Sequence, residues 1–199
     1  MNLGVWRLQM EAEIEQLRNL DLGYELDENV IFPPGDPGTL LGLNDAAGLE
    51  AESPLSAFYR ACGGVSLPDA HVGYFVHKPE LVVRGLSSGE PRRITGAFEG
   101  DVLVFGSDGG GGRFALVPDG FGEVLYLGEG AVHDAVFDGT YGKVRLLADN
   151  LEKFLSQVLA DLKAAGQSVL VAESNDKHIA DVINRTYVIE RGSVVELQR

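Results

Sequence analysis

Glycine is distributed unevenly along this chain of 199 residues, and that distribution limits the folds open to it. Half of the 26 glycines lie between Gly96 and Gly142, where they separate short apolar runs. Runs this short, joined by glycine turns, leave no room for the crossover helices that parallel strands need. The pattern therefore predicts an antiparallel meander, with strands at residues 72–76, 81–84, 101–105, 113–117, 123–127, 131–137 and 143–147.

Helical periodicity appears on both sides of this strand-rich part. A helix at residues 5–20 would carry one apolar stripe, formed by Trp6, Met10, Ile14 and Leu17. Ser53-Pro54 is typical of a helix start, and Gly63-Gly64 of a helix end. A third helix is expected over residues 149–165, with Asp149 as its N-cap. Together these elements predict an α+β fold, in which an antiparallel sheet of about six short strands carries the N-terminal and C-terminal helices on one face.

The chain divides into three expected segments. Residues 1–52 would form a helix followed by a loop, because Pro33, Pro34 and Pro37 interrupt any continuous helix there. Residues 53–165 would form the core. Residues 166–199 are typical of an added β-α-β-β piece, either packed on an edge of the main sheet or loosely attached, with a strand at 168–172, a helix at 176–184 and a hairpin that turns at 191–192.

Charge narrows the classes of partner. Sixteen basic and thirty acidic residues give a net charge of −14, and residues 1–60 carry the largest share of the excess. A nucleic-acid binder normally shows a basic stripe, and none is visible here. An anionic membrane surface is disfavoured for the same reason. Such a field attracts cations or basic proteins, although acidity also serves solubility alone.

Three further features of the sequence bear on the cellular compartment of the protein. No apolar run approaches the ~20 residues that span a bilayer. The first ten residues lack the basic flank and apolar block of a secretory signal. Cys62 is the single cysteine, which excludes an internal disulfide. We therefore expect a cytoplasmic protein.

No motif in the sequence predicts catalysis, a metal or a cofactor. The run from Gly106 to Arg113 has part of a phosphate-loop spacing, but Gly112-Arg113 replaces the lysine and hydroxyl residue, and a strand is expected after it. A wide turn between strands is the preferred interpretation. The four histidines are dispersed, and His133 and Asp134 on one strand would face opposite sides. We expect no enzyme activity.

Four residues are candidates for contact with a protein partner. Tyr74 and Tyr126 lie on expected strands whose alternate side chains face outward, and tyrosines beside acids suit a basic partner. Asp108, at the tip of the glycine turn, and Asp69 supply the acids. The alternative is that the tyrosines fill the core.

Four segments in order resemble the SUKH superfamily, which unites Syd-like proteins with the Smi/Knr-type cell-wall regulators: residues 53–68, 104–116, 122–127 and 148–155. The shared order is a helix that ends in Gly-Gly, a glycine-rich turn before an aromatic strand, and a closing helix. The resemblance implies an α+β binding protein with mainly structural roles for Gly63, Gly64, Gly106, Gly111 and Phe114. Asp108 also matches the family pattern. Cys62 stands where the family usually has asparagine.

The resemblance also implies a function. Many bacterial members are similar to immunity proteins that neutralise toxins, often nucleases, by direct binding. The leading hypothesis is therefore a protein that occludes a basic toxin, and the alternative is a regulatory scaffold that binds a cellular enzyme. Residues 169–176 and 179–192 lie outside the match and resemble the closing segment of an ABC-transporter ATPase. No phosphate loop precedes them, so ATP hydrolysis is not implied.

Overall fold

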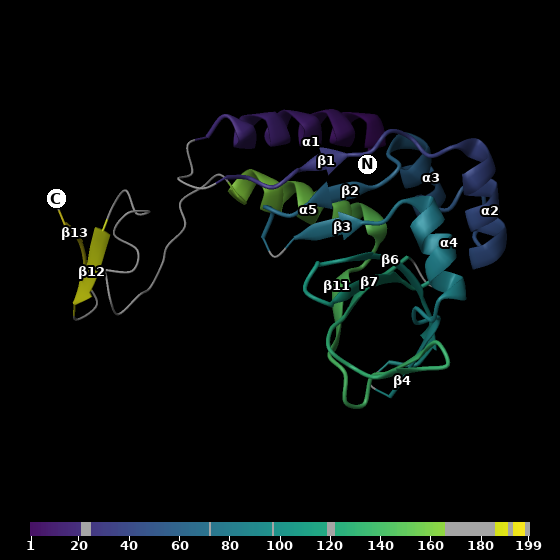
Figure 1. The fold of residues 1–199 in the computed structure, drawn as a ribbon. Coiled ribbons are helices and arrows are strands. Elements are labelled where there is room, and N and C mark those ends of the chain that lie inside the picture. The colour runs from purple at the N-terminus through teal and green to yellow at the C-terminus, as the bar shows by residue number, and fades with distance from the viewer. Residues whose placement is uncertain are drawn as a thin grey trace. The chain divides into compact units, whose positions relative to one another are not determined.

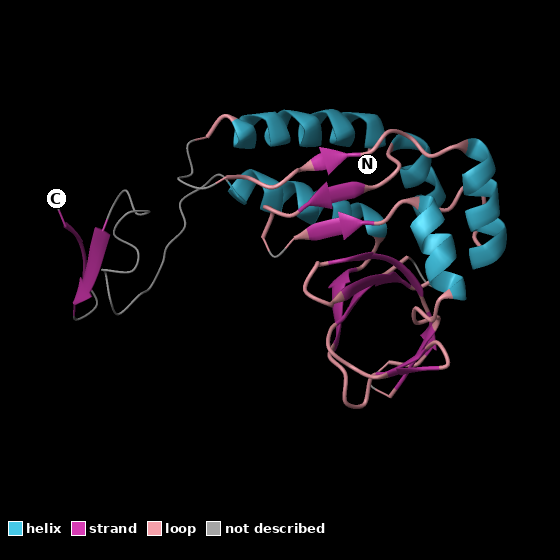
Figure 2. Ribbon diagram, in the orientation of Figure 1, coloured by secondary structure: helices cyan, strands magenta, loops and turns pink. Residues whose placement is uncertain are grey.

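A computed structural model describes residues 1–20, 25–71, 73–96, 98–118, 122–165, 186–190 and 193–197. The chain forms two compact units (Figures 1 and 2). The first joins Met1–Leu20 to Leu26–Gln167, and the second joins Asp21–Glu25 to Ser168–Arg199. The predicted α+β class is confirmed. The N-terminal helix belongs to the same compact unit as the core.

A seven-stranded antiparallel sheet forms the centre of the first unit. Its strand order is β1-β2-β3-β6-β7-β8-β11, with bounds Val30–Ile31, Val65–Leu67, Tyr74–Val76, Leu103–Ser107, Arg113–Leu116, Val124–Leu127 and Val144–Ala148. From β6 to β8 the chain runs as the predicted meander, with each strand paired to the next. The strand β1 lies at one end of this order and β11 at the other.

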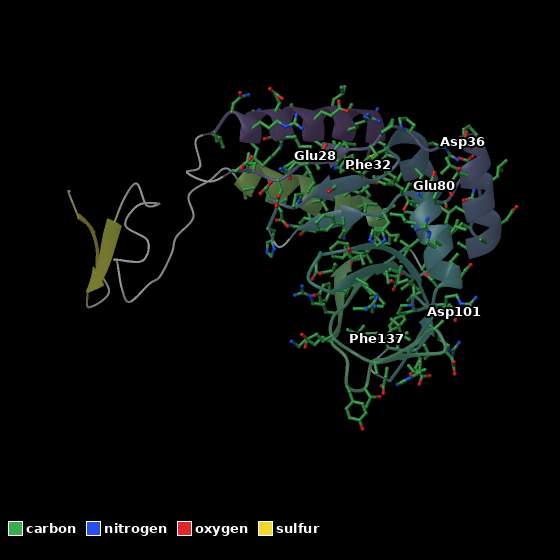
Figure 3. The ribbon with its side chains drawn as sticks, in the orientation of Figure 1. Glu28, Phe32, Asp36, Glu80, Asp101 and Phe137 are labelled. Carbon is green, nitrogen blue, oxygen red and sulfur yellow. The ribbon has the colours of Figure 1, made fainter. Side chains whose placement is uncertain are left out.

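A second, four-stranded sheet covers one face of β6, β7 and β8. Its order is β5 (Gly100–Asp101), β4 (Arg93–Thr95), β10 (Val136–Asp138) and β9 (Val132–His133). In Figure 1, β4, β6, β7 and β11 lie around a ring. Figure 3 places Phe137 inside it, and its side chain is fully buried. The space between the sheets is filled by one apolar cluster: Ile94, Val102, Val104, Ala115, Leu125, Leu127 and Phe137.

Helices pack on the opposite face of the large sheet. On β6 and β7, Phe105 and Phe114 point away from the cluster because successive strand residues face opposite sides. Their ring centroids lie 5.7 and 5.2 Å, respectively, from the ring centroid of Phe154 on α5 (Leu151–Ala165). On α1 (Leu3–Arg18) the predicted stripe is buried, and the indole N–H of Trp6 donates to the Leu155 carbonyl oxygen at 2.9 Å. The predicted helix after Ser53 is also present, as α3 (Pro54–Ala61).

Two structural predictions for the N-terminal half are wrong. The expected loop of residues 21–52 contains β1 and the helix α2 (Pro37–Ala47). Pro37 begins α2 because the first turn of a helix leaves its N–H groups unpaired, and the Asp36 side chain caps that turn. The expected strand at 81–84 is part of the helix α4 (Pro79–Ser87), which also starts with proline.

Further differences concern β9, β10 and α5. The expected strand at 131–137 is a hairpin, in which Asp134 and Ala135 have φ values of 50° and 62°. Asp134 therefore lies in a turn, and the expected alternation of His133 and Asp134 along one strand is wrong. The N-cap of α5 is Asn150, whose side-chain oxygen accepts from the Lys153 N–H at 2.9 Å; Asp149 forms an ion pair with Lys153 instead.

In the second unit, β12 (Thr186–Glu190) pairs antiparallel with β13 (Ser193–Leu197). This is the predicted C-terminal hairpin. The strand expected at 168–172, the helix at 176–184 and the turn at 191–192 lie outside the described residues.

Candidate functional site

The glycine-rich segment between β6 and β7 is a turn held together by Asp108. One carboxylate oxygen, Oδ1, accepts from the N–H groups of Gly110 and Gly112 at 2.8 and 2.9 Å. The other, Oδ2, accepts from the Tyr126 hydroxyl at 2.7 Å. A Cβ at Gly112 would lie 2.3 Å from that hydroxyl oxygen, so glycine is needed there. The side chain of Asp108 therefore closes its own turn.

The contacts between Asp108 and Tyr126 shift the pKa values of both side chains. Burial acts to raise the pKa of Asp108, but the hydrogen bonds from Tyr126, Gly110 and Gly112 outweigh it and lower the pKa. The hydrogen bond to Asp108 and partial burial raise the pKa of Tyr126. The Arg145 guanidinium carbon lies 4.6 Å from the centroid of the Tyr126 ring. Asp108 and Tyr126 thus meet, but as a charged, internally satisfied pair.

Tyr74 lies on the face of the sheet that α5 covers. Its ring stacks on Phe114 with centroids 5.7 Å apart and meets Phe154 edge-on at 6.1 Å. Its hydroxyl donates to the Asp161 carboxylate on α5. Burial, reinforced by that hydrogen bond, raises the pKa of Tyr74. Since Phe114 also lies 6.4 Å from Tyr126, the two tyrosines form one row with Phe114, at the boundary between α5 and the sheet.

The fourth candidate, Asp69, is tied to the edge of the sheet. Its carboxylate accepts from the side-chain amide of buried Asn29 at 2.6 Å, and its N–H donates back to the Asn29 side-chain oxygen at 3.4 Å. Asn29 directly precedes β1. The structure therefore brings Asp108, Tyr126 and Tyr74 to one row, and places Asp69 in a separate contact.

The glycines expected to have structural roles lie where the backbone packs closely or has a positive φ value. A Cβ at Gly63 would lie 2.1 Å from the Pro33 carbonyl oxygen, and one at Gly106 would lie 2.5 Å from that of Phe75. Gly64 and Gly111 have positive φ values. Beside Gly63, Cys62 is buried, and burial raises the pKa of its thiol to about 11. These contacts give each position a structural reason for its residue type.

Sequence reasoning missed a polar cluster around Ser107. The His77 Nε2 atom lies 3.2 Å from the Ser107 hydroxyl oxygen, and burial lowers the pKa of His77 although Glu90 opposes the shift. Arg113, which pairs with Ser107 in the β6–β7 ladder, holds Glu90 at 2.6 Å. Thirty residues separate His77 from Ser107, so only the β3–β6 pairing brings them together. Among the described residues, no three His, Cys, Asp or Glu side chains gather closely enough to hold a metal ion.

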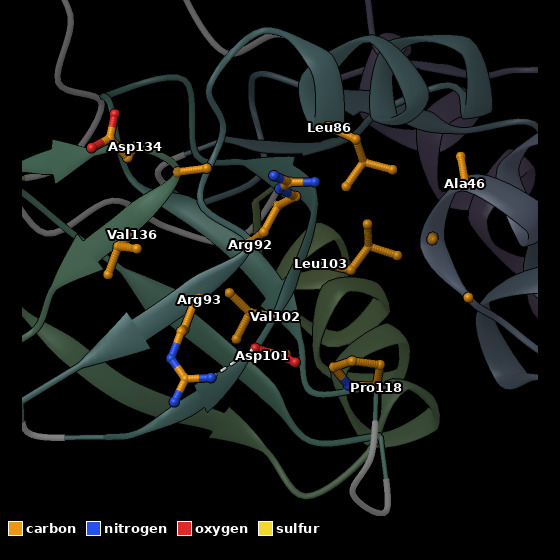
Figure 4. A pocket seen from close by; sticks show the side chains of 13 residues that line it. Ala46, Leu86, Arg92, Arg93, Asp101, Val102, Leu103, Pro118, Asp134 and Val136 are labelled. Atoms are coloured by element: carbon orange, nitrogen blue, oxygen red, sulfur yellow. Dashed lines mark hydrogen bonds and ion pairs between the residues drawn. The ribbon is translucent and has the colours of Figure 1, made fainter.

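A hollow of about 490 Å³ lies beside the four-stranded sheet, called the small sheet below (Figure 4). It was also missed, because its lining comes from segments far apart in the sequence: residues 46–48, 86, 92–93, 101–103, 118 and 134–136. The backbone fixes Arg92 there, since its N–H donates to the Ala135 carbonyl oxygen at 2.8 Å and its own carbonyl oxygen accepts from Val102 at 2.9 Å. Arg93 pairs with Asp101 at 3.3 Å.

Charge is distributed unevenly along the sequence. Residues 19–59 contain eight acidic residues and no Lys, Arg or His; within this stretch lie β1 and α2. Seven of the twelve Lys and Arg side chains between residues 1 and 165 form ion pairs with carboxylates of the chain. Few cations are therefore left to offset the remaining acids, several of which Figure 3 labels: Glu28, Asp36 and Glu80.

No protein-family model matches this chain, and a search of curated proteins finds no match. The described helices include none with the length and apolar character needed to cross a membrane.

Proposed function

We propose that this chain is a non-catalytic, cytoplasmic protein-binding domain that neutralises a basic partner by covering it, as an immunity protein neutralises a toxin such as a nuclease. One observation carries the proposal: the 41 residues without a basic side chain, residues 19–59, include an end strand of the sheet and a helix. The resemblance to the SUKH superfamily supports the same class of function.

We define the acidic edge as residues 26–29, which lead into β1, together with α2 and the segment after it. Asp27 and Glu28 are exposed just before β1, and Asp45 and Glu50 are exposed on or after α2. No basic residue within the stretch competes for these carboxylates. Arg18 donates to the Asn29 carbonyl oxygen and Lys78 lies over the Phe32 ring, but the charged residues of the stretch itself are all acids. A surface with such an acidic excess speeds the approach of an oppositely charged protein and repels acidic ones.

The test is co-expression with each basic toxin candidate encoded near this chain in its native host, scored by rescue of growth. The double variant Glu28→Lys/Glu50→Lys reverses two exposed charges of the acidic edge. Its matched control is Glu99→Lys/Glu129→Lys, which makes the same change in net charge at exposed sites elsewhere in the first unit. Long-range steering changes rates by 10-fold or more, so we expect the first variant to associate about tenfold more slowly and the control to stay near wild type.

Salt provides a second measurement on the same complex. Raising the salt concentration from about 50 mM to about 300 mM shortens the screening length and should slow association. Equal effects of the two double variants, or an association rate that ignores salt, would remove the acidic edge from the proposal. Capture of a cellular enzyme with no toxin that the chain rescues would support the regulatory-scaffold alternative.

A further inference from the structure

The hollow beside the small sheet has the properties of a ligand site. Its volume, about 490 Å³, falls within the 300–1,000 Å³ typical of pockets for small molecules. One wall is apolar, and Figure 4 shows the side chains of Leu86, Leu103 and Pro118 along it. The Arg92 guanidinium extends toward the same space as Leu86 and Leu103.

The two arginines of the hollow differ in what they already bind. Arg93 lies 3.3 Å from an Asp101 oxygen, so its charge is largely matched. Around Arg92, no carboxylate of the described residues lies within 4 Å, and both backbone polar groups of Arg92 are held by hydrogen bonds to Ala135 and Val102. The site therefore offers one guanidinium, on a fixed backbone, beside apolar surface.

This arrangement selects a particular ligand chemistry. A guanidinium binds a carboxylate through two parallel N–H···O bonds, and the apolar wall takes a hydrocarbon body. Asp134 also lines the hollow, and no ion pair of the described residues matches its charge, so a second negative charge on the ligand would meet repulsion. We infer that the hollow binds a small organic monocarboxylate, with its carboxylate at Arg92 and its apolar body against Leu86, Leu103 and Pro118.

The proposal can be tested by NMR titration of the ¹⁵N-labelled full chain. The probe is 4-phenylbutanoate, compared with the neutral 4-phenylbutanamide and the dianion benzylsuccinate. We expect 4-phenylbutanoate to shift the amide signals of residues 92–93, 101–103 and 134–136 in a saturable way, and to bind more tightly than the other two. Equal binding of the amide, stronger binding of the dianion, or shifts confined to other residues would overturn the inference.

Variants locate the interaction. Arg92→Gln should weaken 4-phenylbutanoate binding roughly tenfold to a hundredfold, the range for losing a hydrogen bond to a charged group. Arg84→Gln is the matched control, because Arg84 is exposed on α4 and does not line the hollow. Ala46→Phe, at an exposed lining position of α2, should block binding by filling the space while α2 stays folded. Wild-type affinity in Arg92→Gln or Ala46→Phe would place the ligand elsewhere.

Discussion

Replacing Asp108 with alanine should destabilise the first unit by about 3 kcal/mol. The substitution removes the acceptor of three hydrogen bonds. Gly110 is exposed and its N–H can bond to water, whereas the N–H of buried Gly112 would be left without a partner. An unsatisfied buried donor costs about 1–3 kcal/mol, and each hydrogen bond exchanged for one to water costs about 0.5–1.5 kcal/mol. These contributions sum to about 2–6 kcal/mol, a range that contains the stated value.

Trp6 makes the measurement direct. It is the single tryptophan of the chain and is buried, so its fluorescence reports unfolding of the first unit in urea or on heating. A loss of about 3 kcal/mol corresponds to a melting temperature lower by roughly 6–12 °C for a chain of this size. Asp45→Ala, on an exposed turn of α2, is the control and should change stability little. If Asp108→Ala melts within 1 °C of the control, the hydrogen bonds do not hold the turn as argued.

The same residue predicts a dependence on pH. The pKa of Asp108 is lower in the folded protein than its ordinary value, so its charged form stabilises the fold above about pH 3.9, the unfolded value. That contribution is lost as the pH falls through the folded pKa. The stability difference between wild type and Asp108→Asn should therefore shrink on acidification below about pH 4, and a difference that stays constant from pH 7 to pH 3 would contradict the assignment.

Packing and burial give four further predictions. Gly106→Ala should lower the free energy of unfolding by about 2 kcal/mol or more, because a Cβ there would lie 2.5 Å from the Phe75 carbonyl oxygen. Gly42→Ala, where a Cβ would meet nothing within 4 Å, should instead raise it by about 0.5–1 kcal/mol in the same urea assay. A thiol reagent at about pH 8 should modify native Cys62 roughly a hundredfold more slowly than the unfolded chain, because burial raises its pKa to about 11. Equal rates in the folded and unfolded chain would contradict the raised pKa. Trp6→Phe should lower stability by about 1–2 kcal/mol, measured by circular dichroism, because it removes the hydrogen bond to α5.

The sequence was sufficient where one local pattern determines an element. The stripe on α1 repeats at the helical period, and each of its four residues is buried. The meander from β6 to β8 follows from its turns. At residues 81–84 the pattern was ambiguous, because a run of three apolar residues fits a strand or a short helix. In the structure Pro79 and Val82, three residues apart, are both buried, as on one face of a helix.

Contacts that depend on distant pairing could not be predicted. The parallel pairing of β4 with β10 joins residues about forty positions apart, and no turn in the sequence specifies it. The register of β7 with β8 places Phe114 opposite Tyr126, which brings the tyrosine to Asp108. Residue types alone suggested that Tyr126 and Asp108 were available to a partner. Their mutual hydrogen bond depends on a register that the glycine turns do not reveal.

The net charge of the chain acts on a partner at long range, whereas Arg92 acts on a ligand at contact distance. The two interactions should therefore respond differently to salt. At physiological ionic strength the field of exposed charges is screened within about 8 Å. The attraction between the net charge of −14 and an approaching partner therefore weakens as salt is added. A carboxylate in contact with Arg92 lies well inside that length and responds to its immediate neighbours. Rising salt should therefore slow association at the acidic edge more steeply than it weakens 4-phenylbutanoate binding in the hollow. If the affinity for 4-phenylbutanoate fell with salt as steeply as the association rate does, the result would contradict a direct pair between Arg92 and the ligand carboxylate.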